Sequence, residues 1–254
     1  MKMTDNTILI TGGTSGIGRG LAEAFHALGN KVIIAGRRQD RLDAITADNP
    51  GMRGLSLDVC DVDVVSALAA RLAEEEPALN VLINNAGISR QEKLTPGDAS
   101  LGITRDIVET NIMSVVHATA AFLPLIKTKA NATVITTGSG LAFVPRNNFP
   151  TYCASKAFLH SWVQSLRVQL LREGIEVLEL VPPYVQSELA GAHQLTDPHA
   201  MPLHAFIAEV MENLGKGDTP EGEILVERVK GHRYADRNGE YTKHFANFNG
   251  GVTP

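Results

Sequence analysis

Residues 7–28 read TILITGGTSGIGRGLAEAFHAL: a short apolar run, a glycine-rich turn, and a stretch with apolar residues at helical spacing. This order of strand, loop and helix is the opening of a βαβ unit. Glycines let the backbone turn sharply and approach a ligand closely, and the start of the following helix offers unpaired N–H groups to a pyrophosphate. The alternative is a tight turn that binds nothing, since Gly-x-x-x-Gly-x-Gly differs from the generic G-x-G-x-x-G fingerprint.

The same alternation of short β-branched runs and longer helical patterns continues along the chain, without an internal repeat or a linker. It predicts an α/β class: a single-domain, doubly wound Rossmann fold with a mostly parallel six- or seven-stranded sheet and helices on both faces. Strands are expected at Thr7–Thr11, Lys31–Gly36, Arg53–Leu57, Leu79–Asn84, Thr133–Thr137, Ile175–Val181 and, as the seventh, Glu223–Glu227. Helices are expected at Ile17–Leu28, Val62–Glu75, Ile107–Ile126 (bent or ended by Pro124), Tyr152–Leu171 and Ala205–Leu214.

The amino-acid composition excludes several classes of protein. The chain has 254 residues, 44% of them hydrophobic, which suits one domain over residues 1–254. A net charge of −5 with no basic run, and 5% aromatic residues, argue against a nucleic-acid partner. Two isolated cysteines, scattered histidines and the lack of a long apolar stretch predict a cytoplasmic protein with no metal and no membrane partner.

The end of the second predicted strand, Ala35-Gly36-Arg37-Arg38, bears on the choice of dinucleotide. A carboxylate at this point would take the ribose hydroxyls of NAD(H). A glycine followed by two guanidinium groups instead leaves room and donors for a 2′-phosphate. NADP(H) is therefore favoured over NAD(H), although the arginines could form only a solvated turn, and the nearby Asp40 keeps NAD(H) open.

Three polar residues could carry chemistry. Ser139 follows the fifth predicted strand, and Tyr152 and Lys156 open a helix at i and i+4, which places them on one face. A free tyrosine has a pKa near 10. An ammonium group one turn away is expected to lower that pKa toward neutrality, and the Ser139 hydroxyl could donate to a substrate carbonyl oxygen. Each of these residues is common by itself. The evidence for a catalytic set is that all three follow the glycine turn in this order.

In that order the motifs resemble the short-chain dehydrogenase/reductase family over nearly the whole chain to about Val185. The family's Thr-Gly-x-x-x-Gly-x-Gly is matched by Thr11–Gly18, its Asn-Asn-Ala-Gly by Asn84–Gly87, and its helical asparagine by Asn111. Its Ser, Tyr and Lys set is matched by Ser139, Tyr152 and Lys156. The segments 139–145 and 181–183 also resemble the subgroup linked to D-alanine esterification of lipoteichoic acid, which fixes no substrate.

The resemblance implies roles for these residues. Tyr152 would be the acid–base, Lys156 would lower its pKa and hold the nicotinamide ribose, Ser139 would orient the carbonyl, and Asn111 would support a water-linked proton relay. Family members with arginine just past the second strand typically take NADP(H). The residues assigned to the cofactor are Gly12, Thr14, Ser15, Gly16, Ile17, Gly18, Arg37, Arg38, Asp58, Val59, Asn85, Gly87, Tyr152, Lys156 and Val185.

One departure from the family pattern lies after the sixth strand. Many members have Pro-Gly there, whereas this chain reads Pro182-Pro183-Tyr184-Val185, with Ser187 in place of a usual threonine. Proline has no N–H and a fixed φ, so a stiffer loop over the nicotinamide is expected. The backbone of Val185 is still expected to grip the carboxamide, and Asp58 to contact the adenine.

The expected reaction is hydride transfer between NADP(H) and a small-molecule carbonyl or secondary alcohol. The segment at about 183–221 is expected to enclose the substrate, and a neutral substrate is predicted from apolar candidate walls: Leu141, Phe143, Phe149, Tyr184 and Leu189. A non-catalytic NADP(H)-binding sensor and a sugar-nucleotide epimerase or dehydratase are the alternatives. By family likeness we expect a homodimer or homotetramer through the helices at 107–126 and 152–171, with a tail at about 229–254 packed on the body or on a partner.

Overall fold

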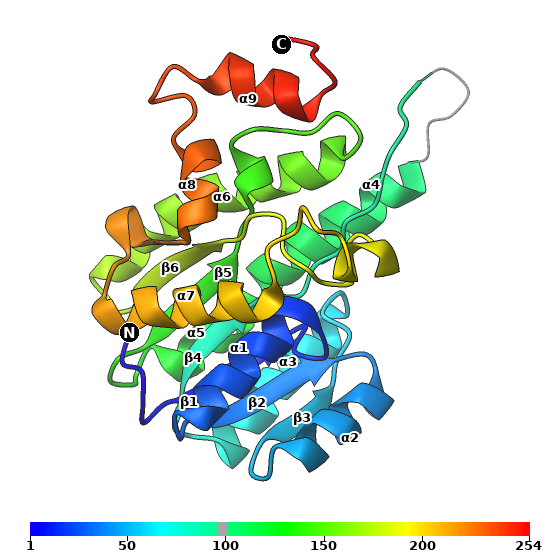
Figure 1. Cartoon of the computed structure of the whole chain (residues 1–254). Helices are drawn as coiled ribbons and strands as arrows, with labels where there is room; N and C mark the ends of the chain where they lie inside the picture. The colour runs from blue at the N-terminus through cyan, green and yellow to red at the C-terminus, as the bar shows by residue number, and fades with distance from the viewer. Residues whose placement is uncertain (96–100) are drawn as a thin grey trace.

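In the computed structural model, which describes residues 1–95 and 101–254, seven parallel strands form one sheet in the order β3-β2-β1-β4-β5-β6-β7 (Figure 1). The strands are β1 (Thr7–Thr11), β2 (Lys31–Gly36), β3 (Arg53–Ser56), β4 (Leu79–Asn84), β5 (Thr133–Thr137), β6 (Glu176–Val181) and β7 (Glu223–Leu225). Most are buried along their whole length, as parallel strands covered on both faces must be. The predicted α/β fold class is confirmed, with the larger number of strands and all of them parallel.

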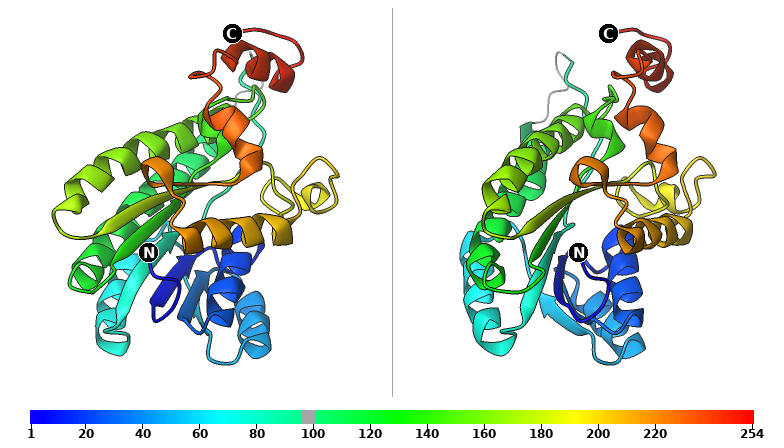
Figure 2. Two further views of the ribbon diagram at one scale, coloured as in Figure 1. Left: turned by 60° about the vertical axis from the view of Figure 1, so that its left-hand side comes forward. Right: turned by 90° about the vertical axis from the view of Figure 1, so that its left-hand side faces the viewer.

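Helices cover both faces of the sheet (Figure 2). One face is covered by α1 (Gly16–Ala27), α2 (Gln39–Asp48) and α7 (Leu203–Lys216), and the other by α3 (Val62–Glu75), α4 (Leu101–Val108), α5 (Ser114–Ile126) and α6 (Pro150–Leu171). Two short helices, α8 (Glu227–Arg233) and α9 (Tyr241–Phe248), end the chain. The α2 helix was not predicted, because only Leu42 and Ile45 of its ten residues are buried and its apolar pattern is weak.

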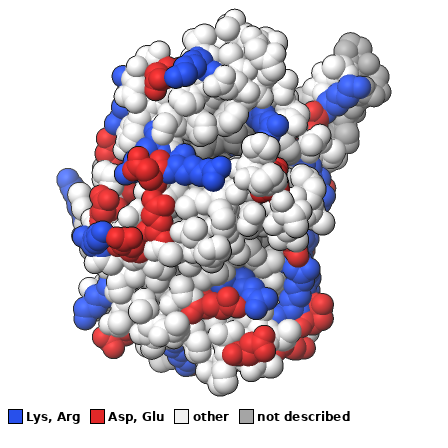
Figure 3. Space-filling model, in the orientation of Figure 1, with Lys and Arg blue, Asp and Glu red and all other residues white. Residues whose placement is uncertain are grey.

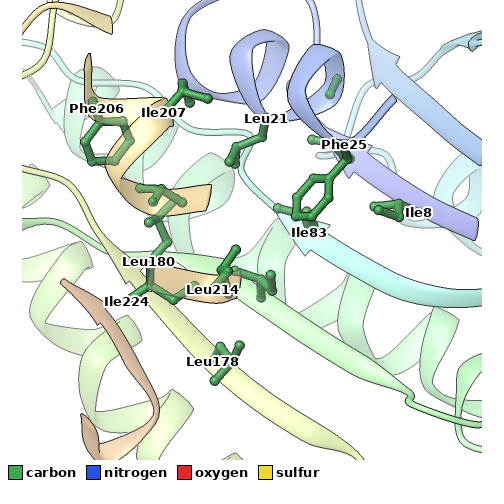
Figure 4. Packing of buried hydrophobic residues seen from close by; sticks show 14 of the residues in the cluster. Ile8, Leu21, Phe25, Ile83, Leu178, Leu180, Phe206, Ile207, Leu214 and Ile224 are labelled. Atoms are coloured by element: carbon green, nitrogen blue, oxygen red, sulfur yellow. The ribbon is translucent and has the colours of Figure 1, made fainter. Parts of the chain in front are cut away.

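The core on the α1 side fixes the position of the glycine turn (Figure 4). Leu21 and Phe25 of α1 are buried against the sheet and against α7. Gly20 lets the two helices approach closely, since a Cβ there would lie 2.7 Å from Ile207 Cγ1. At about 1.5–3 kcal/mol for each large apolar side chain removed from water, this packing holds the start of α1 firmly at the end of β1.

The predicted long helix at 107–126 is interrupted by a π-helical turn. The turn, η1 (Glu109–Met113), joins α4 to α5. The apolar periodicity of the sequence could not reveal it, because a π-turn adds a single residue to the helical register. Pro124 lies inside α5, which ends two residues later at Ile126, at the predicted end. Asn111 lies within the turn, and its side chain is fully buried.

The strand order reverses between β1 and β4, so the loops after these neighbouring strands diverge and leave room at the carboxyl edge of the sheet. Short turns of 3-10 helix, η2 (Gly140–Ala142) and η3 (Ala192–Leu195), lie in the loops of that edge, and η4 (Pro220–Gly222) precedes β7. Basic and acidic side chains are interspersed on the face shown in Figure 3. Within the described part of the chain, no helix combines the length and apolar character needed to cross a bilayer.

Candidate active site

A cavity of about 410 Å³ opens at the carboxyl edge of the sheet. Its walls come from the loops after β1, β2, β3, β4, β5 and β6, which meet beside the reversal in strand order. The cavity is lined by every residue that the sequence assigned to the cofactor except Gly18. A crevice in this position is where open α/β sheets bind their ligands.

The glycine turn lies against the backbone of the loop after β4. Gly12 has φ +67°, and a Cβ there would lie 2.8 Å from the Cα of Ala86. Gly16 has φ +52° and begins α1, whose first turn contains no acidic residue. The N–H groups and the positive end of the α1 dipole therefore border the cavity without a carboxylate in that turn to neutralise them, which fits the diphosphate of a dinucleotide.

Asn85 ties this turn to its neighbouring strands. Its Nδ2 donates to the carbonyl oxygens of Thr11 (3.2 Å) and Gly12 (3.2 Å), and Thr137 Oγ1 donates to its Oδ1 (3.3 Å). A Cβ on Gly18 would lie 2.4 Å from the same Nδ2. Gly18, which the sequence assigns to the cofactor, is not among the lining residues and makes room for the Asn85 amide, which does line the cavity.

Arg38 crosses the turn from the end of β2. Its Nη2 donates to Thr14 Oγ1 (2.9 Å) and Ser15 Oγ (2.7 Å), and its Nη1 lies 3.2 Å from Glu188 Oε2. Arg41 Nη1 lies 2.7 Å from the same carboxylate oxygen. The hydrogen bond from Arg41 holds the pKa of the Glu188 carboxyl below its usual value. No sequence pattern pointed to Glu188, which brings a carboxylate from the segment after β6 to the guanidinium groups.

Arg37 is the more open of the two arginines after β2. Its side chain is 69% exposed, and its Nη1 lies 4.0 Å from Asp58 Oδ2. Gly36 lines the cavity beside Arg37, and a Cβ on Gly36 would lie 2.8 Å from Thr14 Cγ2, so this close approach to Thr14 requires a glycine. The cationic character of this end of the cavity rests on the guanidinium groups of Arg37 and Arg38, which both line it.

Tyr152 and Ser139 lie together where β5 leads into α6. They are 6% and 8% exposed. Burial raises the pKa of Tyr152 to about 12, and a hydrogen bond with Ser139 acts in the opposite direction. Ser139 Oγ also accepts from the N–H of Leu141 (3.1 Å), which fixes the hydroxyl at the start of η2. The phenol is therefore a protonated, positioned acid at neutral pH.

Lys156 lies one helical turn after Tyr152, with its Nζ 5.7 Å from the centre of the Tyr152 ring. Nζ donates to the carbonyl oxygen of Thr137 (2.8 Å). Burial lowers the pKa of Lys156 to about 8, against an opposing effect of Glu179. The structure corrects the expectation that Lys156 lowers the pKa of Tyr152: loss of water from the phenolate outweighs an ammonium group directed at a carbonyl.

Asn111 clamps the loop after β4. Its Oδ1 accepts from the N–H of Ile88 (2.8 Å), and its Nδ2 donates to the carbonyl oxygen of Ile88 (3.0 Å) and to Ser155 Oγ (3.1 Å). A Cβ on Gly87 would lie 3.3 Å from Asn111 Oδ1 and 3.8 Å from Lys156 Nζ. The Asn111 amide and the Lys156 ammonium group therefore both border Gly87.

A second cavity of about 560 Å³ adjoins the first, and both are lined by Ser139 and Tyr152. Four of the predicted substrate walls line it: Leu141, Phe149, Tyr184 and Leu189. Phe143 is not among the lining residues, because its ring packs edge-on against His160 at a centroid distance of 4.7 Å. Most of the other lining residues are polar, but the surface that the lining exposes to the cavity is more apolar than polar, in keeping with the expected apolar walls.

The C-terminal tail forms one side of the second cavity, to which it contributes Asn247 and Phe248. Buried Asn249 accepts from the N–H of Asn147 (2.7 Å) and donates to the carbonyl oxygen of Pro145 (3.1 Å). The α9 helix consequently lies over the loop before α6 (Figure 1). Of the two predicted positions for the tail, the structure shows packing on the chain's own body.

Val185 is held by a residue that sequence analysis missed. Gln194, which is 4% exposed, donates from Nε2 to the Val185 carbonyl oxygen (2.6 Å) and accepts from the N–H of Ala190 (2.8 Å). Gln194 and Val185 both line the first cavity. The segment that contains them has no regular apolar period, so its glutamine carried no readable signal.

A largely buried cluster of ionisable side chains lies near Lys156. Within residues 1–95 and 101–254, one group has the spacing of metal ligands: His160, Glu179 and Glu223. These residues already have protein partners, since His160 Nδ1 lies 2.7 Å from Glu179 Oε2 and Arg233 donates to both oxygens of Glu223 (2.5 and 2.7 Å). The three side chains are therefore held by hydrogen bonds within the protein, and among the described residues Glu179 Oε1 has no hydrogen-bond partner.

Comparisons with known proteins agree with this geometry. The short chain dehydrogenase family model matches residues 6–197. An uncharacterized oxidoreductase, DltE of Bacillus subtilis, is 38% identical over 252 residues, which cover 98% of each chain. A sulfoacetaldehyde reductase of Chromohalobacter salexigens is 37% identical over 73% of this chain and 74% of its own.

The chain is also similar in structure to a solved short-chain dehydrogenase. A short-chain dehydrogenase from Sphingobium yanoikuyae in complex with NADPH superimposes with a TM-score of 0.77 at 25% identity, over 92% of each chain. The family predicted from the order of the glycine, Asn-Asn-Ala-Gly, asparagine and Ser-Tyr-Lys motifs is therefore confirmed. By its family model, its full-length relative and its fold, this chain belongs to the short-chain dehydrogenase/reductase family and is an oxidoreductase.

Proposed function

We propose that this chain is an NADP(H)-dependent oxidoreductase that transfers a hydride between the nicotinamide and a carbonyl or secondary-alcohol carbon, with Tyr152 as acid–base. One observation carries the proposal: Ser139 and Tyr152 stand in the wall shared by the two cavities. A dinucleotide lying along the glycine turn and a substrate in the second cavity would meet at the phenol. That arrangement is what proton transfer coupled to hydride transfer requires.

The chain's own residues then have defined tasks. A bound nicotinamide supplies the hydride chemistry. In the reductive direction Tyr152 gives its proton to the carbonyl oxygen, which the Ser139 hydroxyl holds in place. Lys156, with a pKa of about 8, is mainly protonated at pH 7 and supplies positive charge beside the phenolate as it forms. Asn111 keeps the loop next to Lys156 in position.

Support for NADP(H) comes from the arginines after β2. Arg38 already contacts the hydroxyl groups of the glycine turn, and Arg37 is exposed at the edge of the first cavity. Two guanidinium groups suit a phosphate through charge-assisted, bidentate hydrogen bonds. The Sphingobium relative in complex with NADPH is consistent with this preference.

Two other functions remain as outcomes of the test. A non-catalytic sensor would bind NADPH without turnover. A sugar-nucleotide epimerase or dehydratase would need a substrate domain, whereas the residues after Val185 form α7, β7, α8 and α9 on the body of the same sheet. The epimerase or dehydratase function is therefore the weaker of the two alternatives.

The test is NADPH consumption across a panel of aldehydes and ketones by the wild-type chain and Tyr152→Phe. We expect kcat to fall by at least about 100-fold in the variant, because a general acid contributes about 10²–10⁴ in rate. The dissociation constant for NADPH should stay within about twofold, and Tyr241→Phe in α9 serves as the matched control. Turnover that survives in Tyr152→Phe would refute the role of the phenol.

A homodimer or homotetramer through the long helices is part of the proposal. Apolar side chains stand out from the α6 surface, where Val168 is 73% and Leu171 is 72% exposed, and Leu101 of α4 is 64% exposed. Covering such residues in an interface removes apolar area from water. Light scattering on the purified chain is expected to give at least twice the mass of one chain, and a stable monomer at micromolar concentration would contradict this.

A further inference from the structure

The second cavity is cationic in a chain that is negative overall. Its lining contains two arginines, Arg146 and Arg228, and one carboxylate, Asp197. The chain as a whole has a net charge of −5. The acidic residue is already satisfied, since Asp197 accepts from the Tyr184 hydroxyl (3.0 Å) and from the backbone N–H of His199 (2.8 Å).

The two guanidinium groups are not engaged in ion pairs. Among the described residues, no carboxylate lies within ion-pair distance of Arg146 or Arg228. Arg228 Nη2 donates to the carbonyl oxygen of His199 (2.5 Å), which directs that side chain along the cavity wall. Arginine side chains beside a cavity that hold no carboxylate retain their capacity for bidentate hydrogen bonds to an anion.

The backbone of Arg146 is anchored on three sides. The Arg146 N–H donates to Cys153 Sγ (3.4 Å), next to Tyr152 in the sequence. The residues on either side are held by Asn249, which accepts from Asn147 and donates to Pro145. The backbone that carries Arg146 is thus fixed by α6 and by the tail, which reduces the backbone entropy lost when its exposed side chain binds a ligand.

We propose that the substrate carries an anionic group, a carboxylate or a sulfonate, which binds at Arg146 and Arg228 while its carbonyl group lies at Tyr152 and Ser139. The proposal rests on the proposed function of the shared wall. Reduction takes a hydride from the reduced nicotinamide onto the carbonyl carbon and a proton from Tyr152 onto the oxygen. The product is the alcohol, and the anionic group is unchanged.

One histidine of the cavity, His232, lies against the C-terminal tail. His232 lines the wall, and burial together with His244 lowers its pKa below the usual value. Its ring packs against Phe248 at a centroid distance of 4.7 Å. His232 therefore favours its neutral form, and the proposed anion site rests on the permanently charged arginines.

The first experiment compares matched substrates. With NADPH, kcat/KM is measured for 4-oxobutanoate against its amide, and for 2-oxoethanesulfonate against propanal. We expect at least one anion to exceed its neutral partner by about tenfold or more, the equivalent of about 1.4 kcal/mol. The pair that shows the larger ratio distinguishes carboxylate from sulfonate. Equal rates within each pair would overturn the proposal while leaving the oxidoreductase function intact.

Variants locate the effect. Arg146→Met and Arg228→Met should bring the anion-to-neutral ratio near one by raising KM for the anion, with turnover of the neutral partner retained. Arg146→Lys should recover part of the ratio, and Arg172→Met, at the far end of α6, should change nothing. Equal losses for anionic and neutral substrates would show a merely structural role and contradict the proposal.

A binding measurement decides the matter if no substrate is turned over. Calorimetric titration of succinate and succinamide is carried out on the wild-type chain with NADP⁺ present, and on Arg146→Met. Succinate binding that exceeds succinamide binding and is lost in the variant would support the anion site even though the proposed reaction had failed. Absence of any preference for succinate would refute the site.

Discussion

The two cavities that meet at Tyr152 are built in different ways. The first is lined by turns that follow β-strands directly, so its residues stand at short, fixed distances from recognisable motifs. The second is lined by the loop before α6, by the segment after β6 and by the C-terminal tail, which are far apart in the sequence. The residues of the first cavity can therefore be recognised from local sequence motifs. Those of the second cavity, which we expect to determine substrate specificity, come together only through long-range packing.

The largest expected effect comes from breaking the first cavity. Gly12→Ala places a Cβ 2.8 Å from the Ala86 Cα at a position with φ +67°. The turn must shift, so we expect NADPH affinity to fall by at least about 100-fold together with a loss of about 1–3 kcal/mol in the free energy of unfolding. Both quantities can be measured by fluorescence titration and by urea unfolding.

Gly215 provides the matched control for that change. A Cβ there meets nothing within 4 Å, and the residue lies inside α7. Gly215→Ala should leave NADPH binding unchanged and stabilise the helix by up to about 1 kcal/mol. Unchanged NADPH affinity in Gly12→Ala would show that the glycine turn does not bind the dinucleotide.

A second prediction sharpens the choice of dinucleotide in the same cavity. Arg38→Ala removes the donors that reach Ser15 and Thr14, so the dissociation constant for NADPH should rise about tenfold while that for NADH changes by less than twofold. Glu188→Gln should tighten NADPH binding, since the carboxylate competes for Arg38 and Arg41. Equal weakening of NADPH and NADH would contradict the NADP(H) assignment.

Lys156 links stability to pH in the wall of the first cavity. Its pKa is lowered from 10.5 to about 8 on folding, so between these values the unfolded chain binds more protons than the native one and stability rises with pH. Below pH 8 the buried ammonium group costs about 3 kcal/mol, partly offset by its hydrogen bond to Thr137. Lys156→Met should therefore be about 1–2 kcal/mol more stable than the wild type at pH 7.

That gain should shrink as the pH rises from 8 to 10.5, because the wild-type lysine is then neutral in the native state. Urea unfolding at several pH values measures this difference in stability. The control is Lys127→Met, because Lys127 is an exposed lysine just after α5. A difference between Lys156→Met and wild type that does not vary with pH would show that Lys156 is not buried as a cation.

The smallest expected effect concerns the second cavity. Asn249→Ala removes the hydrogen bonds to Asn147 and Pro145, which should cost about 1–2 kcal/mol in stability. Loosening of the tail should raise KM for the substrate severalfold and leave NADPH affinity unchanged. Asn238→Ala, an exposed position before α9, is the control. A matching fall in NADPH affinity would mean that the two cavities are not independent.

Features near the first cavity could be predicted from the sequence better than features of the second cavity. The strands and the glycine turn were predicted to within one or two residues, because apolar runs and glycine spacing are local signals. Ser139, Tyr152 and Lys156 were also brought together as expected, since they stand at a strand end and near a readable helix start. Asn111 was expected on a helix from Ile107 to Ile126 and instead lies in the π-helical turn η1.

Other features depend on tertiary packing that no local pattern records. The pKa of Tyr152 runs opposite to the expected direction because burial, which a sequence does not state, outweighs the neighbouring ammonium group. Arg146 was not singled out because its anchors, Cys153 and Asn249, are 7 and 103 residues away. The polar residues in the lining of the second cavity were missed for the same reason.

Transfer of isotope from the cofactor tests the central claim most directly, namely that the two cavities meet at the phenol of Tyr152. NADPH carrying deuterium at C4 of the nicotinamide, prepared in each of its two labelled forms, is incubated with the chain and a reactive aldehyde. Mass spectrometry should find one deuterium on the carbinol carbon of the product from one of the two forms. An alcohol that contains no cofactor deuterium from either form would contradict direct transfer across the shared wall.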